Sequence, residues 1–239
     1  MKNILLGFLT VLGTLSCEKN TVFSNNNYLE QNEDTEGKVK YLALGDSYTI
    51  GQSVLPAERW PVQLAEKLNS KGKDIAEPTI LATTGWTTGD LLRAIKNNSA
   101  LANFDIVSLM IGVNNQYQHQ SIDQFRKELS TLIEKSISLV GNNPAHVIVL
   151  SIPDWGVTPA GSNNSLQIAG EIDAFNQVQM EECQKAKVQF IDITASSRTA
   201  KGDSSLIAKD NLHFSGKMYS IWSDIIAEKV GELFKKRNP

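Results

Sequence analysis

The sequence predicts an α/β fold: a three-layer α/β/α sandwich around a five-stranded parallel sheet. Two observations carry this prediction. From residue 38 onward, short apolar runs alternate with longer segments whose apolar residues recur at helical spacing. The third run, residues 105–111, is apolar on both faces, as expected for a central strand of a parallel sheet. Strands joined by helices pair in parallel through right-handed crossovers, so helices are expected to cover both faces of the sheet.

Each expected strand is a short apolar run followed by a turn signal. The first run ends at Gly45, and the second is followed by Thr83-Thr84-Gly85. Glycine marks such turns because it adopts backbone conformations that other residues avoid. The five expected strands are residues 39–44, 79–82, 105–111, 146–152 and 188–193.

Each expected helix is recognised by apolar residues three or four positions apart. In the first, Trp60, Leu64 and Leu68 fall on one side. The second is expected to begin at Thr87 or Thr88, with an acidic residue in its first turn. The five expected helices are residues 60–68, 87–95, 121–140, 166–186 and 215–234.

The first residues of the chain are not expected to belong to the fold. After one Lys, the segment from Ile4 to Leu15 is almost uninterruptedly apolar. It is shorter than the roughly 20 residues that span a bilayer, and it has the length of a signal-peptide core. Residues 1–16 are therefore expected to be a signal peptide for export.

Cys17 follows this segment directly, as in the signals that the segment resembles, those of bacterial lipoproteins. Ser16 fits that pattern, whereas Thr14 and Leu15 depart from it. The resemblance implies that Cys17 becomes lipidated and attaches the protein to a membrane of the bacterial cell envelope. Plain secretion and an uncleaved anchor are the open alternatives. The polar residues 17–37 are expected to form a flexible tether between the lipid and a domain of residues 38–239.

Composition and charge exclude several classes of protein. With 41% hydrophobic and 21% charged residues, the domain is expected to be globular rather than disordered or fibrous. The net charge is −3, and the longest basic run, Lys235-Lys236-Arg237, ends the last expected helix, so no nucleic acid partner is expected. No His, Cys and carboxylate cluster has metal-ligand spacing, which predicts an enzyme without metal or cofactor. Cys183 is expected to be a small buried residue, and the chain is expected to be a monomer.

The unusual polar residues lie in the loops after the expected strands, where ligands bind in folds of this kind. Ser47 follows the first strand, Gly85 the second and Asn114 the third, while Asp210 and His213 precede the last helix. Hydrolysis by a serine requires an exposed hydroxyl, a base to take its proton, a carboxylate to orient that base, and donors for the oxyanion. These five residues, together with the N–H of the serine itself, can fill every role.

Four sequence blocks carry a resemblance to a known family. Gly-Asp-Ser at residues 45–47, the isolated Gly85, Gly-x-Asn at 112–114 and Asp-x-x-His at 210–213 follow the order of the GDSL/SGNH hydrolase superfamily. The resemblance spans residue 38 to the C-terminus and implies a flavodoxin-like α/β/α fold. It implies that Ser47 is the nucleophile, His213 the base and Asp210 its orienting acid, with Gly85 and Asn114 as oxyanion donors.

The sequence departs from the pattern of the superfamily at two positions and contains a second copy of one of its motifs. Tyr48 replaces the Leu of the superfamily's name, and Asn115 stands where many members carry Asp, which bears on a hydrogen bond near the oxyanion loop. A second Gly-Asp-Ser, at residues 202–204, follows no strand and is expected to be a plain turn. Asp46 is expected to brace the serine turn through backbone hydrogen bonds.

The expected function is hydrolysis of a carboxylic ester through an acyl-enzyme, with a short or medium acyl group, for example deacetylation of a carbohydrate. A lysophospholipase or thioesterase activity is the first alternative, and a non-catalytic glycan or envelope binding module is the second. Tyr48, Trp86 and Trp155 adjoin the blocks, and either pocket lining or ordinary packing explains them.

Overall fold

The computed structural model describes residues 37–231 of the chain. The segments predicted to be a signal peptide and tether, including Cys17, lie outside the described residues except for Gly37, and those assignments stay predictions. Within the described range, five parallel strands form one sheet in the order β2-β1-β3-β4-β5, as predicted, and this is a flavodoxin-like strand order. The strands are β1 (Tyr41–Gly45), β2 (Thr79–Ala82), β3 (Ile106–Met110), β4 (Val147–Leu150) and β5 (Gln189–Ile191).

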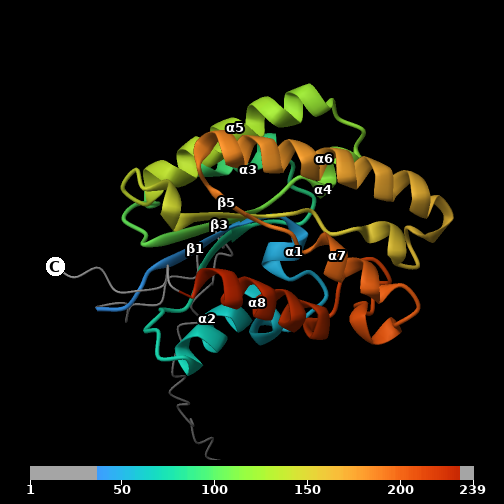
Figure 1. Cartoon of the computed structure of the whole chain (residues 1–239), viewed down its shortest axis with the longest axis horizontal. Helices are drawn as coiled ribbons and strands as arrows, with labels where there is room; N and C mark the ends of the chain where they lie inside the picture. The colour runs from blue at the N-terminus through green and yellow to red at the C-terminus, as the bar shows by residue number, and fades with distance from the viewer. Residues whose placement is uncertain (1–36, 232–239) are drawn as a thin grey trace, which may run out of the picture.

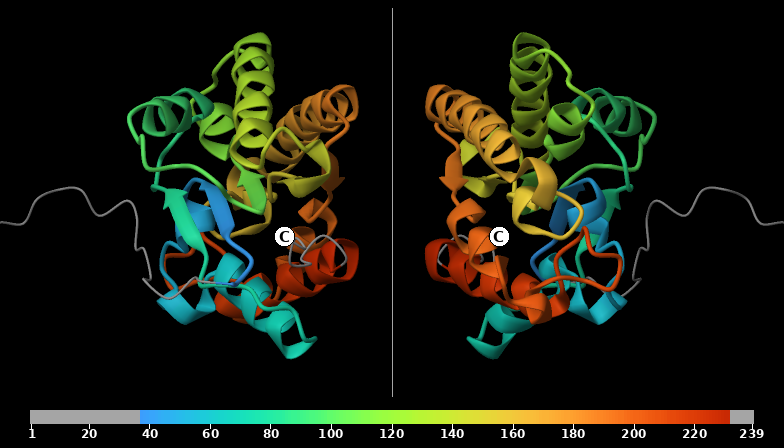
Figure 2. Two further views of the ribbon diagram at one scale, coloured as in Figure 1. Left: turned by 90° about the vertical axis from the view of Figure 1, so that its left-hand side faces the viewer. Right: turned by 90° about the vertical axis from the view of Figure 1, so that its right-hand side faces the viewer.

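Long helices cover both faces of the sheet, which confirms the three-layer sandwich (Figure 1). One layer contains α3, α5 and α6, and the other contains α2 and α8; Figure 2 shows the two layers from both ends of the molecule. The long helices are α2 (Trp60–Ser70), α3 (Thr88–Lys96), α5 (Ile122–Leu139), α6 (Ser165–Ala186) and α8 (Gly216–Val230). None of the described helices is long and apolar enough to cross a membrane.

The helices form where the sequence gives them one apolar face and a cap. In α5, Phe125, Leu129 and Leu132 are fully buried on one side, and Ser121 caps the first turn by accepting the N–H of Gln124. Every residue of β1, β3 and β4 is buried, as expected of strands covered on both faces. The core therefore lies on both sides of the sheet.

Three short helices were expected to be loops. They are α1 (Ser47–Ile50), α4 (Val113–Tyr117) and α7 (Thr194–Ser197). Helices this short contain too few residues to show a 3.6-residue apolar period, so the sequence does not reveal them. Two of them, α1 and α4, contain predicted site residues, and each begins within three residues of the strand before it.

The structure also differs from the sequence-based prediction in where some strands and helices begin and end. Several strands are shorter than expected; Val39, for example, forms only an isolated bridge with Ile75 instead of joining β1. The end of the last expected helix, residues 232–234, lies outside the described residues. Six 3₁₀ helices complete the described chain: η1 (Pro56–Glu58), η2 (Pro144–His146), η3 (Trp155–Val157), η4 (Ser162–Asn164), η5 (Arg198–Ala200) and η6 (Ser204–Leu206).

Candidate active site

The turn from β1 into α1 positions Ser47. Asp46 is the N-cap of α1, and its Oδ1 accepts the N–H of Tyr48 at 3.1 Å, so the expected bracing hydrogen bond is present. Gly45 is required because the chain folds back closely here. A Cβ on Gly45 would lie 2.1 Å from Thr49 Oγ1 and 2.5 Å from the Met110 carbonyl oxygen. Any other residue at this position would push α1 away from the end of the sheet.

Ser47 occupies the first position of α1 and is only 4% exposed. Its N–H is one of those that the first turn of a helix leaves without an intrahelical acceptor. Among the described residues, no hydrogen bond joins the Ser47 hydroxyl to His213 or to any other group. Hydrogen bonds between a nucleophile and its base are often loose before substrate binds.

Asp210 and His213, the predicted orienting acid and base, lie in contact with each other. Asp210 Oδ2 lies 2.7 Å from His213 Nδ1, and Asp210 Oδ1 accepts the N–H groups of Leu212 and His213 at 3.0 and 2.9 Å. The hydroxyl of Ser53 donates a further hydrogen bond of 2.5 Å to Asp210 Oδ2. The carboxylate thus holds both the ring of His213 and the backbone that carries it.

This set of donors keeps Asp210 ionised. Burial would raise the pKa of Asp210, but the hydrogen bonds from Ser53, Leu212 and His213 outweigh it and hold that pKa well below its usual range. A carboxylate that faces Nδ1 favours the tautomer with a proton on that nitrogen and a free lone pair on Nε2. His213 is therefore prepared to accept a proton from a neighbouring hydroxyl.

The two predicted oxyanion donors lie in the turns after β2 and β3. Gly85 has φ +86°, a left-handed conformation that favours glycine, and a Cβ there would meet nothing within 4 Å. The space in front of its backbone is open to a ligand. Asn114, in the first turn of α4, donates from Nδ2 to the Trp86 carbonyl at 2.9 Å. One N–H of this amide fixes the side chain, and its second N–H is left for another acceptor.

Contacts between turns bring the two halves together. The backbone N–H of Gly112 lies near enough to the carboxylate of Asp46 to lower its pKa, so the Ser47 turn adjoins the loop that leads to Asn114. The ring of Tyr48 meets the ring of His213 edge to face, with centroids 5.6 Å apart. The residue after the serine and the predicted base are therefore neighbours, although 165 positions separate them in sequence.

The structure answers the remaining questions raised by the sequence. Asn115, one of the two departures, is fully buried: its Nδ2 donates to Thr88 Oγ1 at 2.7 Å and its Oδ1 accepts the Thr88 N–H at 3.0 Å. The amide of Asn115 can therefore bond both to the hydroxyl and to the N–H of Thr88, the first residue of α3. Cys183 is buried, as expected, and burial raises the pKa of its thiol to about 12. The second Gly-Asp-Ser is a turn in which Asp203 caps η6, also as expected.

Two residues that contact the predicted site or the loops around it were not identified from the sequence. Ser53 contacts Asp210 across 157 positions, and Gln116 accepts a hydrogen bond of 2.8 Å from the ring N–H of Trp155. Neither lies in a recognisable motif. Of the three aromatic residues left open, Tyr48 packs in the core, Trp86 is half-buried against it, and Trp155 both packs and lines a cavity.

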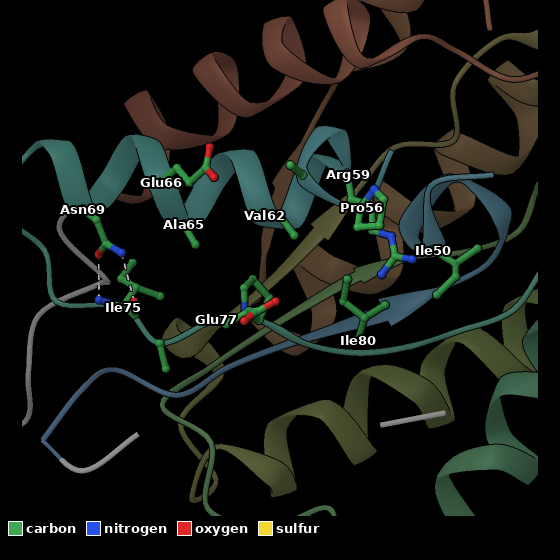
Figure 3. Close-up of a pocket in the computed structure, with 13 residues that line it drawn as sticks. Ile50, Pro56, Arg59, Val62, Ala65, Glu66, Asn69, Ile75, Glu77 and Ile80 are labelled. Atoms are coloured by element: carbon green, nitrogen blue, oxygen red, sulfur yellow. Dashed lines mark hydrogen bonds between the residues drawn. The ribbon is translucent and has the colours of Figure 1, made fainter. Parts of the chain in front are cut away.

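Two of the cavities within the described residues bear on the site. The larger, of about 600 Å³, lies between α2 and β2; its walls are mostly aliphatic, and the side chain of Arg59 points into it (Figure 3). None of the five predicted site residues lines it, although Ile50 at the end of α1 does. The smaller cavity, of about 320 Å³, includes Gln116 and Tyr117 of α4, the helix that carries Asn114. Within residues 37–231, no group of three or more His, Cys, Asp or Glu side chains could hold a metal ion.

Comparisons with known proteins agree with this architecture. The lipase/acylhydrolase of Enterococcus faecalis has 19% identity and a TM-score of 0.67, covering 84% of this chain and 100% of its own. A variant of an acetyl xylan esterase from Geobacillus stearothermophilus has 18% identity and a TM-score of 0.66, with coverage of 82% and 96%. An esterase from a Pseudoalteromonas species has 18% identity and a TM-score of 0.62, with coverage of 81% and 97%. At such identities these likenesses establish the fold alone.

No curated protein sequence matches the chain. The family model described as the GDSL-like lipase/acylhydrolase family matches residues 43–221, which is most of the chain and includes all five predicted site residues. The chain therefore belongs to the GDSL-like lipase/acylhydrolase family.

Proposed function

We propose that the protein is a serine esterase that cleaves carboxylic esters through an acyl-enzyme, with a short or medium acyl group such as the acetyl group of an esterified carbohydrate. The observation that carries this proposal is the 2.7 Å hydrogen bond between Asp210 and His213, whose ring meets that of Tyr48, the residue after Ser47 in the first turn of α1. Membership of the family and the presence of esterases among the structural neighbours support the reaction class.

In the proposed reaction, Ser47 Oγ attacks the ester carbonyl carbon while His213 Nε2 takes the hydroxyl proton. Asp210 stabilises the resulting imidazolium without taking its proton. The tetrahedral intermediate then expels the alcohol, which receives the proton from His213. Water, deprotonated by the same imidazole, attacks the acyl-enzyme and releases the carboxylic acid and free Ser47.

The oxyanion of both intermediates needs donors that are already in place. The backbone N–H groups of Ser47 and Gly85 and the second N–H of Asn114 supply them in this proposal. Donors of this kind stabilise the transition state because they need no reorganisation when the charge develops. The hydrogen bond from Asn114 to the Trp86 carbonyl supports this role, since it fixes the amide before substrate arrives.

The proposal is tested by replacing each serine of the two Gly-Asp-Ser copies. Ser47→Ala is expected to lower kcat for p-nitrophenyl acetate by roughly 10⁵- to 10⁶-fold, because no nucleophile remains. Ser204→Ala, in the second copy, is the matched control and should leave turnover unchanged, because Ser204 is exposed in a turn. Thermal unfolding of both variants should match that of the original chain.

A fluorophosphonate probe gives an independent reading. Labelling of the original chain and of Ser204→Ala, but not of Ser47→Ala, is the expected pattern. Undiminished turnover in Ser47→Ala would overturn the proposal, and absence of both turnover and labelling in the original chain would favour the binding module. A profile from acetyl to palmitoyl esters separates the short-chain esterase from the lysophospholipase and thioesterase alternatives.

A further inference from the structure

The smaller cavity adjoins α4, the helix that carries the predicted oxyanion donor Asn114. It is lined by the end of α4, by Trp155 of η3 and by the first turns of α6. Asn114 bonds to the loop after β2, whereas Gln116, two positions later, bonds to Trp155 in the loop after β4. In the sheet order, β2 and β4 lie on opposite sides of β3. The cavity is therefore at the same carboxyl edge as Ser47, adjacent to α4 on its β4 side.

A chain of hydrogen bonds fixes the polar wall of this cavity. Trp155 Nε1 donates to Gln116 Oε1 at 2.8 Å, and Gln116 Nε2 donates to Glu171 Oε2 at 2.5 Å. Gln167 Nε2 donates to the other oxygen of Glu171 at 2.8 Å. The hydrogen bonds from Gln167 and Gln116 hold the pKa of Glu171 below its usual range. Glu171 is therefore an ionised acceptor, and each of its oxygens keeps lone pairs for a further donor.

An exposed aromatic ring forms another part of the lining. Tyr117 is 61% exposed and meets Trp155 edge to face, with ring centroids 5.5 Å apart and planes at 66°. An exposed tyrosine offers an apolar face and a polar tip at low conformational cost. The hydrogen-bonded Trp155 supports it from one side.

The chemistry of the lining selects among ligands. Five of the eight lining residues are polar, including the ionised Glu171. An acyl chain in this cavity would remove water from a carboxylate and give it no hydrogen bond in return, which is costly. A ring with hydroxyl groups at its edge and an apolar face fits instead, because the hydroxyls donate to Glu171 while the face covers Tyr117. The other cavity, between α2 and β2, has mostly aliphatic walls, but none of the five predicted site residues lines it (Figure 3).

We propose that this cavity is the subsite for the alcohol part of the substrate and that it binds a sugar ring. This inference rests on the proposed esterase function and narrows its substrate to an acylated carbohydrate. Tyr117 and Glu171 act by binding the sugar; they take no part in bond breaking. The cavity volume of about 320 Å³ has room for one monosaccharide unit.

The test compares two acetyl esters that differ only in the alcohol part: acetylated xylotriose, one sugar unit of which can occupy the subsite, and vinyl acetate, whose alcohol part is too small to reach it. Tyr117→Ala and Glu171→Gln are each expected to raise KM for acetylated xylotriose roughly tenfold, the effect of losing one stacking or charged hydrogen-bond contact. Kinetics with vinyl acetate should stay unchanged. Leu166→Ala is the matched control, since Leu166 is 89% exposed next to Gln167 but does not line the cavity.

The kinetic results distinguish a failure of the subsite inference from a failure of the proposed esterase function. If the full chain cleaves vinyl acetate and either variant binds acetylated xylotriose as well as the original chain does, the subsite inference is wrong and the esterase stands. Equal losses on both substrates would indicate a structural defect and also overturn the inference. A shift in preference from acetyl to octanoyl esters in Tyr117→Ala would identify the cavity as an acyl site. If the full chain cleaves neither ester, the proposed function itself fails.

Discussion

Asp46 and Asp210 lie close in sequence to the predicted nucleophile and the predicted base, and their environments shift the pKa of the two carboxyl groups in opposite directions. Asp46, which precedes Ser47, is 1% exposed, and burial raises its pKa to about 7 despite hydrogen bonds from backbone N–H groups such as that of Tyr48. The side chain of Asp210 is 30% exposed. Burial opposes its ionisation too, but hydrogen bonds from Ser53, the backbone and His213 lower its pKa below the usual range.

The difference shows that the hydrogen-bond donors around a carboxyl group and its exposure to water, rather than its distance in sequence from Ser47, set its charge. Asp210 is charged at neutral pH and faces an imidazole. Asp46 holds the turn together and is partly protonated near pH 7. The two residues also affect stability with opposite signs, because a raised carboxyl pKa favours the folded state at low pH and a lowered one favours it at higher pH.

Among changes that test the contrast between the two aspartates, the largest effect is expected from Asp210→Asn. The amide can still accept from the backbone, but its NH₂ group would face Nδ1 of His213 and favour the wrong tautomer of the ring. We expect kcat for p-nitrophenyl acetate to fall by roughly 10⁴-fold with little change in KM, as for the equivalent change in other serine hydrolases. Steady-state kinetics at pH 7 measure this.

The matched control for that variant is Asp203→Asn, in the second Gly-Asp-Ser copy. Asp203 caps a surface turn, and its side chain is 46% exposed, so its replacement should leave kcat unaltered. If Asp210→Asn kept more than about a tenth of the original kcat, Asp210 would not be the orienting acid.

A smaller effect, on stability rather than on chemistry, is expected from Asp46→Asn. In the original chain the unfolded carboxyl loses its proton near pH 4, whereas the folded one keeps it until about pH 7. Stability therefore falls as pH rises through that window, by roughly 1.4 kcal/mol for each pH unit. Asparagine has no proton to lose and can still cap α1.

Urea unfolding of Asp46→Asn and of the original chain between pH 4 and pH 8 measures this difference. The stability of the variant relative to the original chain should increase steadily across the window. Parallel curves would show that Asp46 titrates normally and would remove the contrast with Asp210.

The sequence could predict those features of the fold and of the site that follow a local or periodic pattern. The strands and long helices were predicted because burial recurs along them with a regular period, as at Phe125, Leu129 and Leu132 of α5. The five site residues were singled out because turns after parallel strands meet at one edge of the sheet. The structure joins Asp210 to His213 as expected, and Asn114 to the turn after β2.

What the sequence could not predict depends on contacts between distant segments. The pKa of Asp46 follows from complete burial under α1, a helix too short to show a period. The hydroxyl of Ser53 reaches Asp210 only because the chain after α1 passes beside the loop before α8. No local pattern marks either feature, since both arise from tertiary packing.

The smallest effect is expected from Ser53→Ala, which removes a single donor from Asp210. At neutral pH Asp210 stays ionised and water can reach its oxygen, so kcat should fall only about two- to tenfold. Removal of the donor raises the pKa of Asp210 toward its ordinary value. The stability that Asp210 contributes above the unfolded pKa, near 4, is therefore reduced, and the variant should be less stable than the original chain at pH 6. Both folded chains keep Asp210 ionised somewhat below pH 4, because its folded pKa is lowered, and the difference should shrink only as pH falls through those lowered folded pKa values. Any backbone effect of the substitution is independent of pH, so a difference that stayed constant as pH falls through the folded pKa of Asp210 in the variant would show that the Ser53 hydroxyl does not act through the charge of Asp210.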